Sequence, residues 1–268
     1  MFPPTLIPPP FDPGTVWLVG AGPGDPGLLT LHAVHALAQA EVILYDALVS
    51  EEILSLAGQA RLEPAGKRAG GHRTPQLRIN QRLIALARQG ARVVRLKGGD
   101  PLIFGRGGEE ALALAAAGIP FRIVPGISAG IGGTAAASIP LTHRGIARSV
   151  TFATGHDQSG ALTGLDWTAL GDVVVLYMAG RQLGEIAARL LASGRDPAEG
   201  VALIQDASRP GQTVEVTTLA DAASRPVSAS PTLIVIGPVV ALRDRLTAWQ
   251  QTAPMTVLEV QQPAQALG

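Results

Sequence analysis

The chain of 268 residues contains no cysteine. That absence excludes disulfide bonds, thiolate catalysis and metal sites built from cysteine. Charge is also scarce, because charged residues make up only 16% of the chain and the basic and acidic residues cancel to a formal net charge of zero. Nucleic acids are bound mainly through an excess of positive charge, so we expect no nucleic-acid partner.

Long apolar runs are absent too. A membrane-spanning helix needs about 20 consecutive apolar residues, and no run in the sequence reaches that length, so we expect no membrane partner. Residues 1–13 are rich in proline and contain no basic residue, unlike a targeting peptide. Residues 250–268 lose helical periodicity. We expect both segments to be loose tails, the protein to be cytoplasmic, and no further domain to precede the first strand.

What the sequence has is an alternation of short apolar segments and longer amphipathic ones, with 47% hydrophobic residues to build a core. The short segments predict strands at residues 15–19, 41–45, 91–96, 121–124, 149–154, 172–177, 200–205 and 232–237. The longer segments predict helices at 28–39, 50–56, 75–89 (with Leu77, Ile84 and Ala87 on one face), 109–117, 128–137, 184–192 and 239–249. This alternation is typical of a largely parallel α/β sheet. We expect two α/β domains, residues 14–140 and 141–249, with a cofactor cleft between them.

A glycine-rich turn, residues 20–27 with the sequence Gly-Ala-Gly-Pro-Gly-Asp-Pro-Gly, follows the first predicted strand. An acidic residue, Asp46, lies about 20 residues further on, as in dinucleotide-binding folds. However, Asp25 replaces the third glycine of that fingerprint and brings a negative charge to the place of a phosphate. Pro23 and Pro26 lack the backbone N–H groups that a pyrophosphate needs. The turn therefore favours a ligand without phosphate, and a purely structural strand-to-helix turn is the alternative.

Three other residues, Lys67, Lys97 and Asp100, are candidates for a functional site. Only two of the 21 basic residues are lysines, Lys67 and Lys97, which hints at selection for the ammonium group itself. Asp100 follows a predicted strand, where α/β proteins bind ligands. Its carboxylate could accept hydrogen bonds from a cofactor, and a helix N-cap is the alternative role.

Six motifs occur in one order along the chain. They are the glycine-rich turn at 20–27, Tyr45-Asp46, Gly66-Lys67-Arg68, the run 95–110 (Arg-Leu-Lys-Gly-Gly-Asp-Pro-Leu-Ile-Phe-Gly-Arg-Gly-Gly-Glu-Glu), the run 124–129 (Val-Pro-Gly-Ile-Ser-Ala) and the run 139–144 (Ile-Pro-Leu-Thr-His-Arg). This set resembles the tetrapyrrole methylase family and, within it, the uroporphyrinogen III C-methyltransferases, over residues 16–246. Family members with other substrates share the first turn, whereas the run 95–110 is narrower and points to this subfamily.

The resemblance implies a two-domain α/β fold, a homodimer, and S-adenosylmethionine as methyl donor with S-adenosylhomocysteine as product. It implies two successive methylations of uroporphyrinogen III, through precorrin-1 to precorrin-2, in sirohaem and cobalamin biosynthesis. It places the cofactor against Pro23, Gly98, Gly99, Asp100, Ile103, Ser128, Ala129, Met178 and Ala207. Ser128 stands where the family usually has Thr. Asp206-Ala207-Ser208 stands where Asn-Gly-Thr is common, so a contact at Ala207 would be made by its backbone.

The resemblance also implies a proton acceptor at Asp46 and a proton donor at Lys67. The spacing between them is one residue shorter than the family pattern, so Arg68 competes with Lys67 for the second role. A carboxylate suits the chemistry, because a pyrrole carbon that accepts a methyl group leaves a cationic ring that must lose a proton. The same carbon is the nucleophile, so no serine, cysteine or metal is required.

Three alternative functions stay open at this point. The first is a related enzyme that methylates a later corrin precursor. The second is a dinucleotide-dependent oxidoreductase, which the glycine-rich turn would serve. The third is a non-catalytic sensor of small molecules that has kept the cofactor-binding fold.

Overall fold

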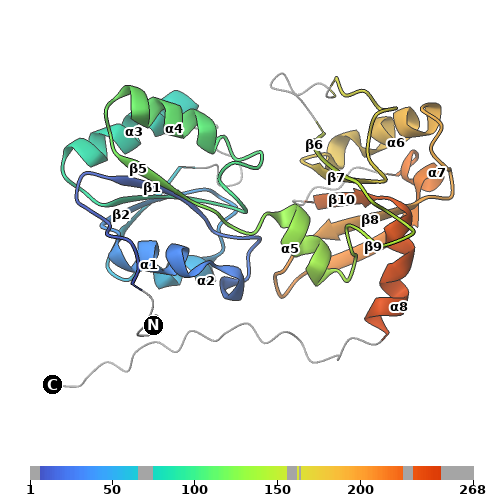
Figure 1. The fold of residues 1–268 in the computed structure, drawn as a ribbon, viewed down its shortest axis with the longest axis horizontal. Coiled ribbons are helices and arrows are strands. Elements are labelled where there is room, and N and C mark those ends of the chain that lie inside the picture. The colour runs from blue at the N-terminus through green and yellow to red at the C-terminus, as the bar shows by residue number, and fades with distance from the viewer. Residues whose placement is uncertain (1–6, 66–74, 156–161, 163, 226–231, 249–268) are drawn as a thin grey trace. The chain divides into compact units, whose positions relative to one another are not determined.

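The computed structural model describes residues 7–65, 75–155, 162, 164–225 and 232–248. These residues form two compact units (Figure 1), each with its own five-stranded sheet. The first unit comprises residues up to 101 together with 106–126, and the second comprises 102–105 and 127–250. No helix in the described part of the chain is long and apolar enough to cross a membrane.

The first unit is a parallel α/β sheet with strand order β3-β2-β4-β1-β5. Its strands are β1 (Val16–Gly20), β2 (Val42–Tyr45), β3 (Arg61–Pro64), β4 (Val93–Lys97) and β5 (Phe121–Val124). Its helices are η1 (Pro26–Leu28), α1 (Leu31–Gln39), α2 (Glu51–Leu54), η2 (Ser55–Ala57), α3 (Gln76–Arg88) and α4 (Gly107–Ala116). Helices α1 and α2 cover one face of this sheet and α3 and α4 the other.

Both faces of the first sheet are buried, so β1 is apolar at every position. Trp17 and Val19 pack toward α1 and α2, and Val16 and Leu18 pack toward α3 and α4. Each fully buried side chain of this kind contributes about 1.5–3 kcal/mol to folding. The two hydrophobic layers hold the carboxyl ends of the strands in a fixed register at one edge.

The second unit has the strand order β6-β7-β10-β8-β9 and is mixed rather than largely parallel. Only β6 and β7 pair in parallel among its strands, whereas the other three neighbouring pairs are antiparallel. The strands are β6 (Val150–Thr154), β7 (Val173–Tyr177), β8 (Gly200–Gln205), β9 (Thr213–Thr218) and β10 (Thr232–Ile236), and the helices are α5 (Ala129–Ala136), η3 (Gly180–Gln182), α6 (Leu183–Ala192), α7 (Leu219–Ala222), η4 (Pro238–Leu242) and α8 (Arg243–Thr247). The α/β class is confirmed, and the largely parallel prediction is wrong for this unit.

Two strands, β3 and β9, were not predicted from the sequence, and both lie at a sheet edge. Among the described residues β3 pairs only with β2, and β9 pairs only with β8. Their side chains are mostly exposed or half-buried. An edge strand with little buried surface needs no apolar run, so neither segment carried the signal on which the other strands were predicted.

Some predicted boundaries and faces also differ from the structure. The units divide after Gly126 rather than at residue 140, because α5 packs against strands of the second sheet. Leu77 on α3 is 66% exposed, and the core-facing side chains of that helix are Ile79, Leu83, Leu86 and Ala87. The predicted helix 239–249 is a 3₁₀ turn followed by the short α8.

The predicted N-terminal tail is anchored where the structure describes it. Phe11 is buried, and its ring stacks on Trp17 with 4.5 Å between the ring centroids. Aromatic stacking of this kind adds to the free energy of burial. The prediction that the whole segment 1–13 is loose is therefore wrong at Phe11, while the C-terminal segment 250–268 lies outside the described residues.

Candidate active site

The first unit brings most of its predicted site residues to the carboxyl edge of the sheet. The glycine-rich turn follows β1, Asp46 follows β2, and Gly98, Gly99 and Asp100 follow β4. The two glycine loops are joined, because Gly22 and Gly99 exchange backbone N–H···O hydrogen bonds of 3.1 and 2.7 Å. Pro23 lies half-buried in the turn beside this pair. Parallel strands meet at one edge by geometry, so residues far apart in sequence share a small area.

Asp25 has a structural role in the turn. Its carboxylate is buried and caps η1 by accepting a hydrogen bond of 2.7 Å from the backbone N–H of Gly27. This bond occupies an N–H group of the turn that a phosphate would otherwise use. The structure thus strengthens the argument against a dinucleotide at this turn.

Asp100 also has a structural partner. Its Oδ2 accepts a hydrogen bond of 3.0 Å from the backbone N–H of Gly126, which follows β5. The bond ties the loop after β4 to the loop after β5 within the same unit. The alternative of a helix N-cap is wrong, because the residue at the N-cap of α4 is Arg106. A cofactor contact by Asp100 stays a prediction.

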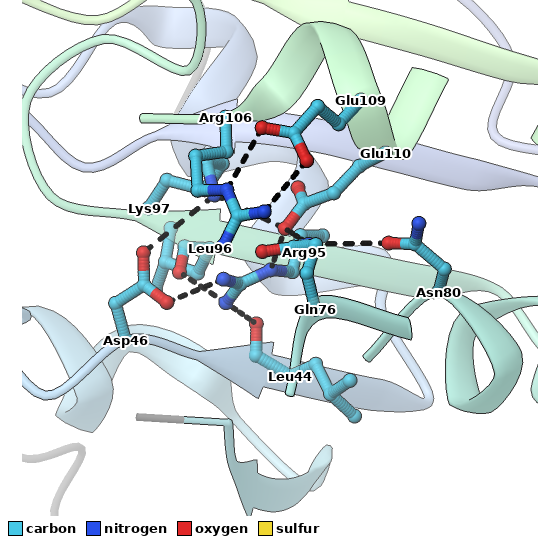
Figure 2. A network of polar contacts seen from close by, with 10 residues as sticks. All are labelled: Leu44, Asp46, Gln76, Asn80, Arg95, Leu96, Lys97, Arg106, Glu109 and Glu110. Atoms are coloured by element: carbon cyan, nitrogen blue, oxygen red, sulfur yellow. Dashed lines mark hydrogen bonds and ion pairs between the residues drawn. The ribbon is translucent and has the colours of Figure 1, made fainter. Parts of the chain in front are cut away.

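Asp46 lies in a cluster of charges that is mostly buried (Figure 2). Its Oδ1 accepts a hydrogen bond from Nη2 of Arg95, and its Oδ2 lies 3.7 Å from Nζ of Lys97. Glu110 contacts the same two cations through one oxygen, with Oε1 3.0 Å from Nε of Arg95 and 3.2 Å from Nζ of Lys97. Asp46 is the exposed member, with 30% of its side chain accessible, whereas the other three are at most 2% accessible.

Burial and neighbouring charges act differently on the two cations. The pKa of Lys97 is lowered, first by burial and then by repulsion from Arg95, and the carboxylates of Asp46 and Glu110 offset only part of that. Burial also acts against the charged form of Arg95, but the carboxylates of Asp46 and Glu110 outweigh it and raise the pKa of Arg95. The cluster therefore presents one accessible carboxylate that is backed by two buried cations.

Lys67 and Arg68 lie outside the described residues, so the structure does not decide between them as proton donor. No role was predicted for Arg95 or Glu110 from the sequence. A signal was present, since Arg95 and Lys97 interrupt an otherwise apolar strand and alternate residues of a strand share one face.

The second unit holds the other predicted cofactor residues, and Tyr177 contacts the start of α5, where two of them lie. Ser128 precedes α5, and its Oγ lies 2.6 Å from Oη of Tyr177. The same Oη accepts a hydrogen bond of 2.8 Å from the backbone N–H of Gly130. Ala129, half-buried, begins α5 between these two contacts. Tyr177 thereby fixes the first turn of the helix, a role that the sequence analysis missed.

Apolar side chains follow this tyrosine in the sequence or pack on its ring. Met178 follows Tyr177 and is 50% exposed. Ile103, which precedes Phe104, is 42% exposed. Phe104 packs its ring 4.9 Å from that of Tyr177. Met178 and Phe104 both adopt a left-handed backbone, with φ of 55° and 52°. Such strain in non-glycine residues concentrates at functional sites, and the apolar surface suits a ligand that carries no phosphate.

Ala207 lies at the same edge of the second sheet as Met178. Strands β7 and β8 run in the same direction on either side of β10, and Met178 and Ala207 follow their respective carboxyl ends. Ala207 is half-buried between two residues with left-handed backbone, Asp206 and Ser208. Its place at the edge agrees with a backbone contact, which stays a prediction.

Comparison with known proteins supplies the relationship that geometry alone leaves open. The family Tetrapyrrole (Corrin/Porphyrin) Methylases matches residues 15–223. A uroporphyrinogen-III C-methyltransferase from Sinorhizobium is 54% identical over 246 residues, which cover 89% of this chain and 88% of the relative. Siroheme synthase 2 from Aeromonas hydrophila is 52% identical over 241 residues, but the chain spans only 51% of that relative's length.

A solved structure of the same kind of enzyme is also similar to this chain. The uroporphyrin-III C-methyl transferase from Thermus thermophilus, in complex with S-adenyl homocysteine, superposes with a TM-score of 0.76 at 38% identity. The match covers 85% of this chain and 99% of that one. The resemblance noted in the sequence is thus confirmed over most of the chain, which belongs to the tetrapyrrole methylase family.

Proposed function

We propose that this protein is an S-adenosylmethionine-dependent C-methyltransferase that converts uroporphyrinogen III to precorrin-2 through precorrin-1. The observation that carries the proposal is the 54% identity to a uroporphyrinogen-III C-methyltransferase across 88% of that relative. The Thermus enzyme, with S-adenyl homocysteine bound, supports the same cofactor. The geometry adds an accessible carboxylate, Asp46, at the edge of the sheet where α/β enzymes bind their ligands.

The chemistry asks little of the protein beyond orientation and one proton transfer. S-adenosylmethionine supplies an electrophilic methyl group, and an electron-rich pyrrole carbon of the substrate attacks it in line. The methylated ring is cationic and becomes neutral when it loses a proton. Asp46 accepts that proton or, while ionised, stabilises the positive charge.

The residues of the second unit fit the cofactor's chemistry. The cofactor carries no phosphate, and the flat face of its adenine ring can pack on the exposed apolar side chains of Ile103, Phe104 and Met178. In the first unit Asp25 already engages the N–H of Gly27, which disfavours a pyrophosphate. Pro23, Gly98 to Asp100, Ser128, Ala129 and Ala207 stay predicted contacts.

The first prediction concerns the choice of cofactor. Titration calorimetry should show that S-adenosylmethionine and S-adenosylhomocysteine bind, and that NAD and NADP do not. The expected discrimination follows from the missing N–H donors at Pro23 and Pro26 and from the occupied N–H of Gly27. Tighter binding of either dinucleotide than of S-adenosylhomocysteine would instead favour an oxidoreductase.

The second prediction concerns the course of the reaction. The glycine-rich turn and the Gly98-Gly99-Asp100 loop each occur once in the chain, so one site should carry out both methylations in turn. Anaerobic incubation with uroporphyrinogen III and S-adenosylmethionine should therefore give a singly methylated species first and a doubly methylated product later, as followed by mass spectrometry. A product that stops at one methyl group, or activity only on a later corrin precursor, would assign the chain to another enzyme of the family.

Three expectations stay proposals beside this function. Lys67, or its neighbour Arg68, is proposed as the proton donor. A homodimer and a cytoplasmic location are proposed from the family resemblance and the composition. Whether precorrin-2 then enters sirohaem or cobalamin synthesis depends on the enzymes that consume it.

A further inference from the structure

The four charges around Asp46 come from three separate elements of the first unit. Arg95 and Lys97 are alternate residues of β4, so both side chains leave the sheet on the face that α3 and α4 cover. Glu110 comes from the first turn of α4, and Asp46 follows β2. The backbone N–H of Asp46 donates to the carbonyl of Leu96, between the two cations, with 3.1 Å between the heavy atoms. The sheet register itself therefore holds the aspartate beside both basic side chains.

Such a cluster is costly to bury, and packing alone does not require it. Apolar residues of similar volume in place of a buried ion pair are often equally or more stable. Here Arg95 and Lys97 stand in a strand whose other residues are valine and leucine. Glu110 of α4 is buried against both of them. One carboxylate oxygen, Oε2 of Glu110, is buried without a hydrogen-bond partner among the described residues. A role beyond stability would explain why the charges stand at this position.

The contacts within the cluster converge on the accessible carboxylate of Asp46. Each oxygen of Asp46 faces a different cation, Oδ1 toward Arg95 and Oδ2 toward Lys97. Glu110 binds both cations from the protein interior through its Oε1. Gln76 of α3 donates to that same oxygen at 3.0 Å, and in turn lies 3.1 Å from Oδ1 of Asn80. The interior groups fix the cations, and the cations fix the aspartate.

We propose that Arg95, Lys97 and Glu110 are positioning residues for the methyl-transfer reaction, which hold the Asp46 carboxylate in place for the substrate. This inference rests on the proposed function and goes beyond it by naming three residues that act on the reaction through Asp46. Arg95 and Lys97 each hold one oxygen of that carboxylate. Glu110 balances the second cation, so its removal leaves Asp46 between two cations with no competing anion.

The two polar partners therefore act on the position of Asp46 in different ways. Among the described residues the charged groups that face this carboxylate are Arg95 and Lys97 of β4, with Glu110 of α4 behind them and Arg106 near Glu110. An apolar residue in place of Lys97 removes the cation beside Oδ2 of Asp46. A neutral residue in place of Glu110 weakens the interior contact that holds both cations.

The experiment compares Lys97→Met, Glu110→Gln and the matched control Glu185→Gln in the full chain. Glu185 lies in the first turn of α6, carries the same charge as Glu110, and pairs with Arg189 in an ion pair in which the Glu185 side chain is 56% exposed. Turnover at saturating substrate should fall about 10- to 100-fold in the first two variants, the scale of a misplaced catalytic group. The control should keep wild-type turnover. Affinity for S-adenosylhomocysteine, measured by calorimetry, should be unchanged in all three.

Two readouts separate positioning from a general loss of structure. Lys97→Arg, which keeps a cation beside Oδ2 of Asp46, should retain more turnover than Lys97→Met, whereas a merely structural role of the side chain would give no such rescue. In an Asp46→Asn background, Glu110→Gln should cause no further loss, because residues that act through one group are not additive. If Lys97→Met does not fold, Glu110→Gln and the double variant still decide the question.

The outcomes distinguish this proposal from the function on which it rests. If Asp46→Asn loses turnover while Lys97→Met and Glu110→Gln keep it, the positioning role is wrong and the function stands. If the two variants lose turnover as fully in the Asp46→Asn background as in the native one, they act independently of Asp46 and the proposal fails. If the wild-type protein does not methylate uroporphyrinogen III, the proposed function itself is wrong.

Discussion

Replacement of Asp46 by asparagine should lower turnover by about 10²-fold or more, the scale typical of a general acid–base group. The amide has nearly the same shape and can still accept a hydrogen bond from Arg95, so the local structure should be kept. What it loses is the ability to take up a proton and the negative charge between Arg95 and Lys97. The measurement is the rate of methyl transfer to uroporphyrinogen III at saturating concentrations of both substrates.

The design needs a control for the loss of a negative charge and a check on folding. Asp244→Asn makes the same chemical change at a side chain that is 93% exposed, and it should leave turnover unchanged. Calorimetry with S-adenosylhomocysteine should give the wild-type affinity for Asp46→Asn. Wild-type turnover in Asp46→Asn would mean that the aspartate only holds the buried cations in place and that the proton leaves by another route.

The second large effect is expected on stability, from a single methyl group at Gly126. A Cβ atom at this position would lie 2.3 Å from the carbonyl oxygen of Gly99 and 2.7 Å from Cα of Gly20. Both neighbours are backbone, which cannot move aside as a flexible side chain would. The loops after β1, β4 and β5 therefore meet at a point where only hydrogen fits. Gly126→Ala should lower the free energy of unfolding by about 3 kcal/mol, at the upper end of the usual cost of overpacking.

Denaturant unfolding of Gly126→Ala can be compared with that of Gly108→Ala. Gly108 lies in α4, where an added Cβ would meet no atom within 4 Å. That substitution should raise the free energy of unfolding by about 0.5–1 kcal/mol, because alanine loses less conformational entropy in a helix than glycine does. If both variants unfold at the wild-type midpoint, the loops after the strands are not packed as closely as the structure describes.

Local sequence patterns determined the elements that are buried on both faces. β1, β2 and β10 are apolar at nearly every position, since the core covers both of their sides. The edge strands β3 and β9 gave no comparable signal, because they bury little surface and lack an apolar run. Strand direction in the second sheet was also hidden, since it depends on how distant segments pair rather than on the composition of each strand.

The site residues also divide into those that the sequence predicted and those that only the tertiary structure brought together. The sequence by itself determined the family and the glycine turns, and it predicted Asp46 as a site residue, because these depend on residue type and order along the chain. It singled out Lys97 as one of two lysines, but neither its partners nor its burial could be read from order alone. Only the tertiary structure decided that Arg95, Lys97, Glu110 and Asp46 form one cluster, because the register of β2 against β4 and the packing of α4 place their charges within contact distance. Contacts between residues far apart in sequence are set by sheet register and helix packing, which local patterns do not encode.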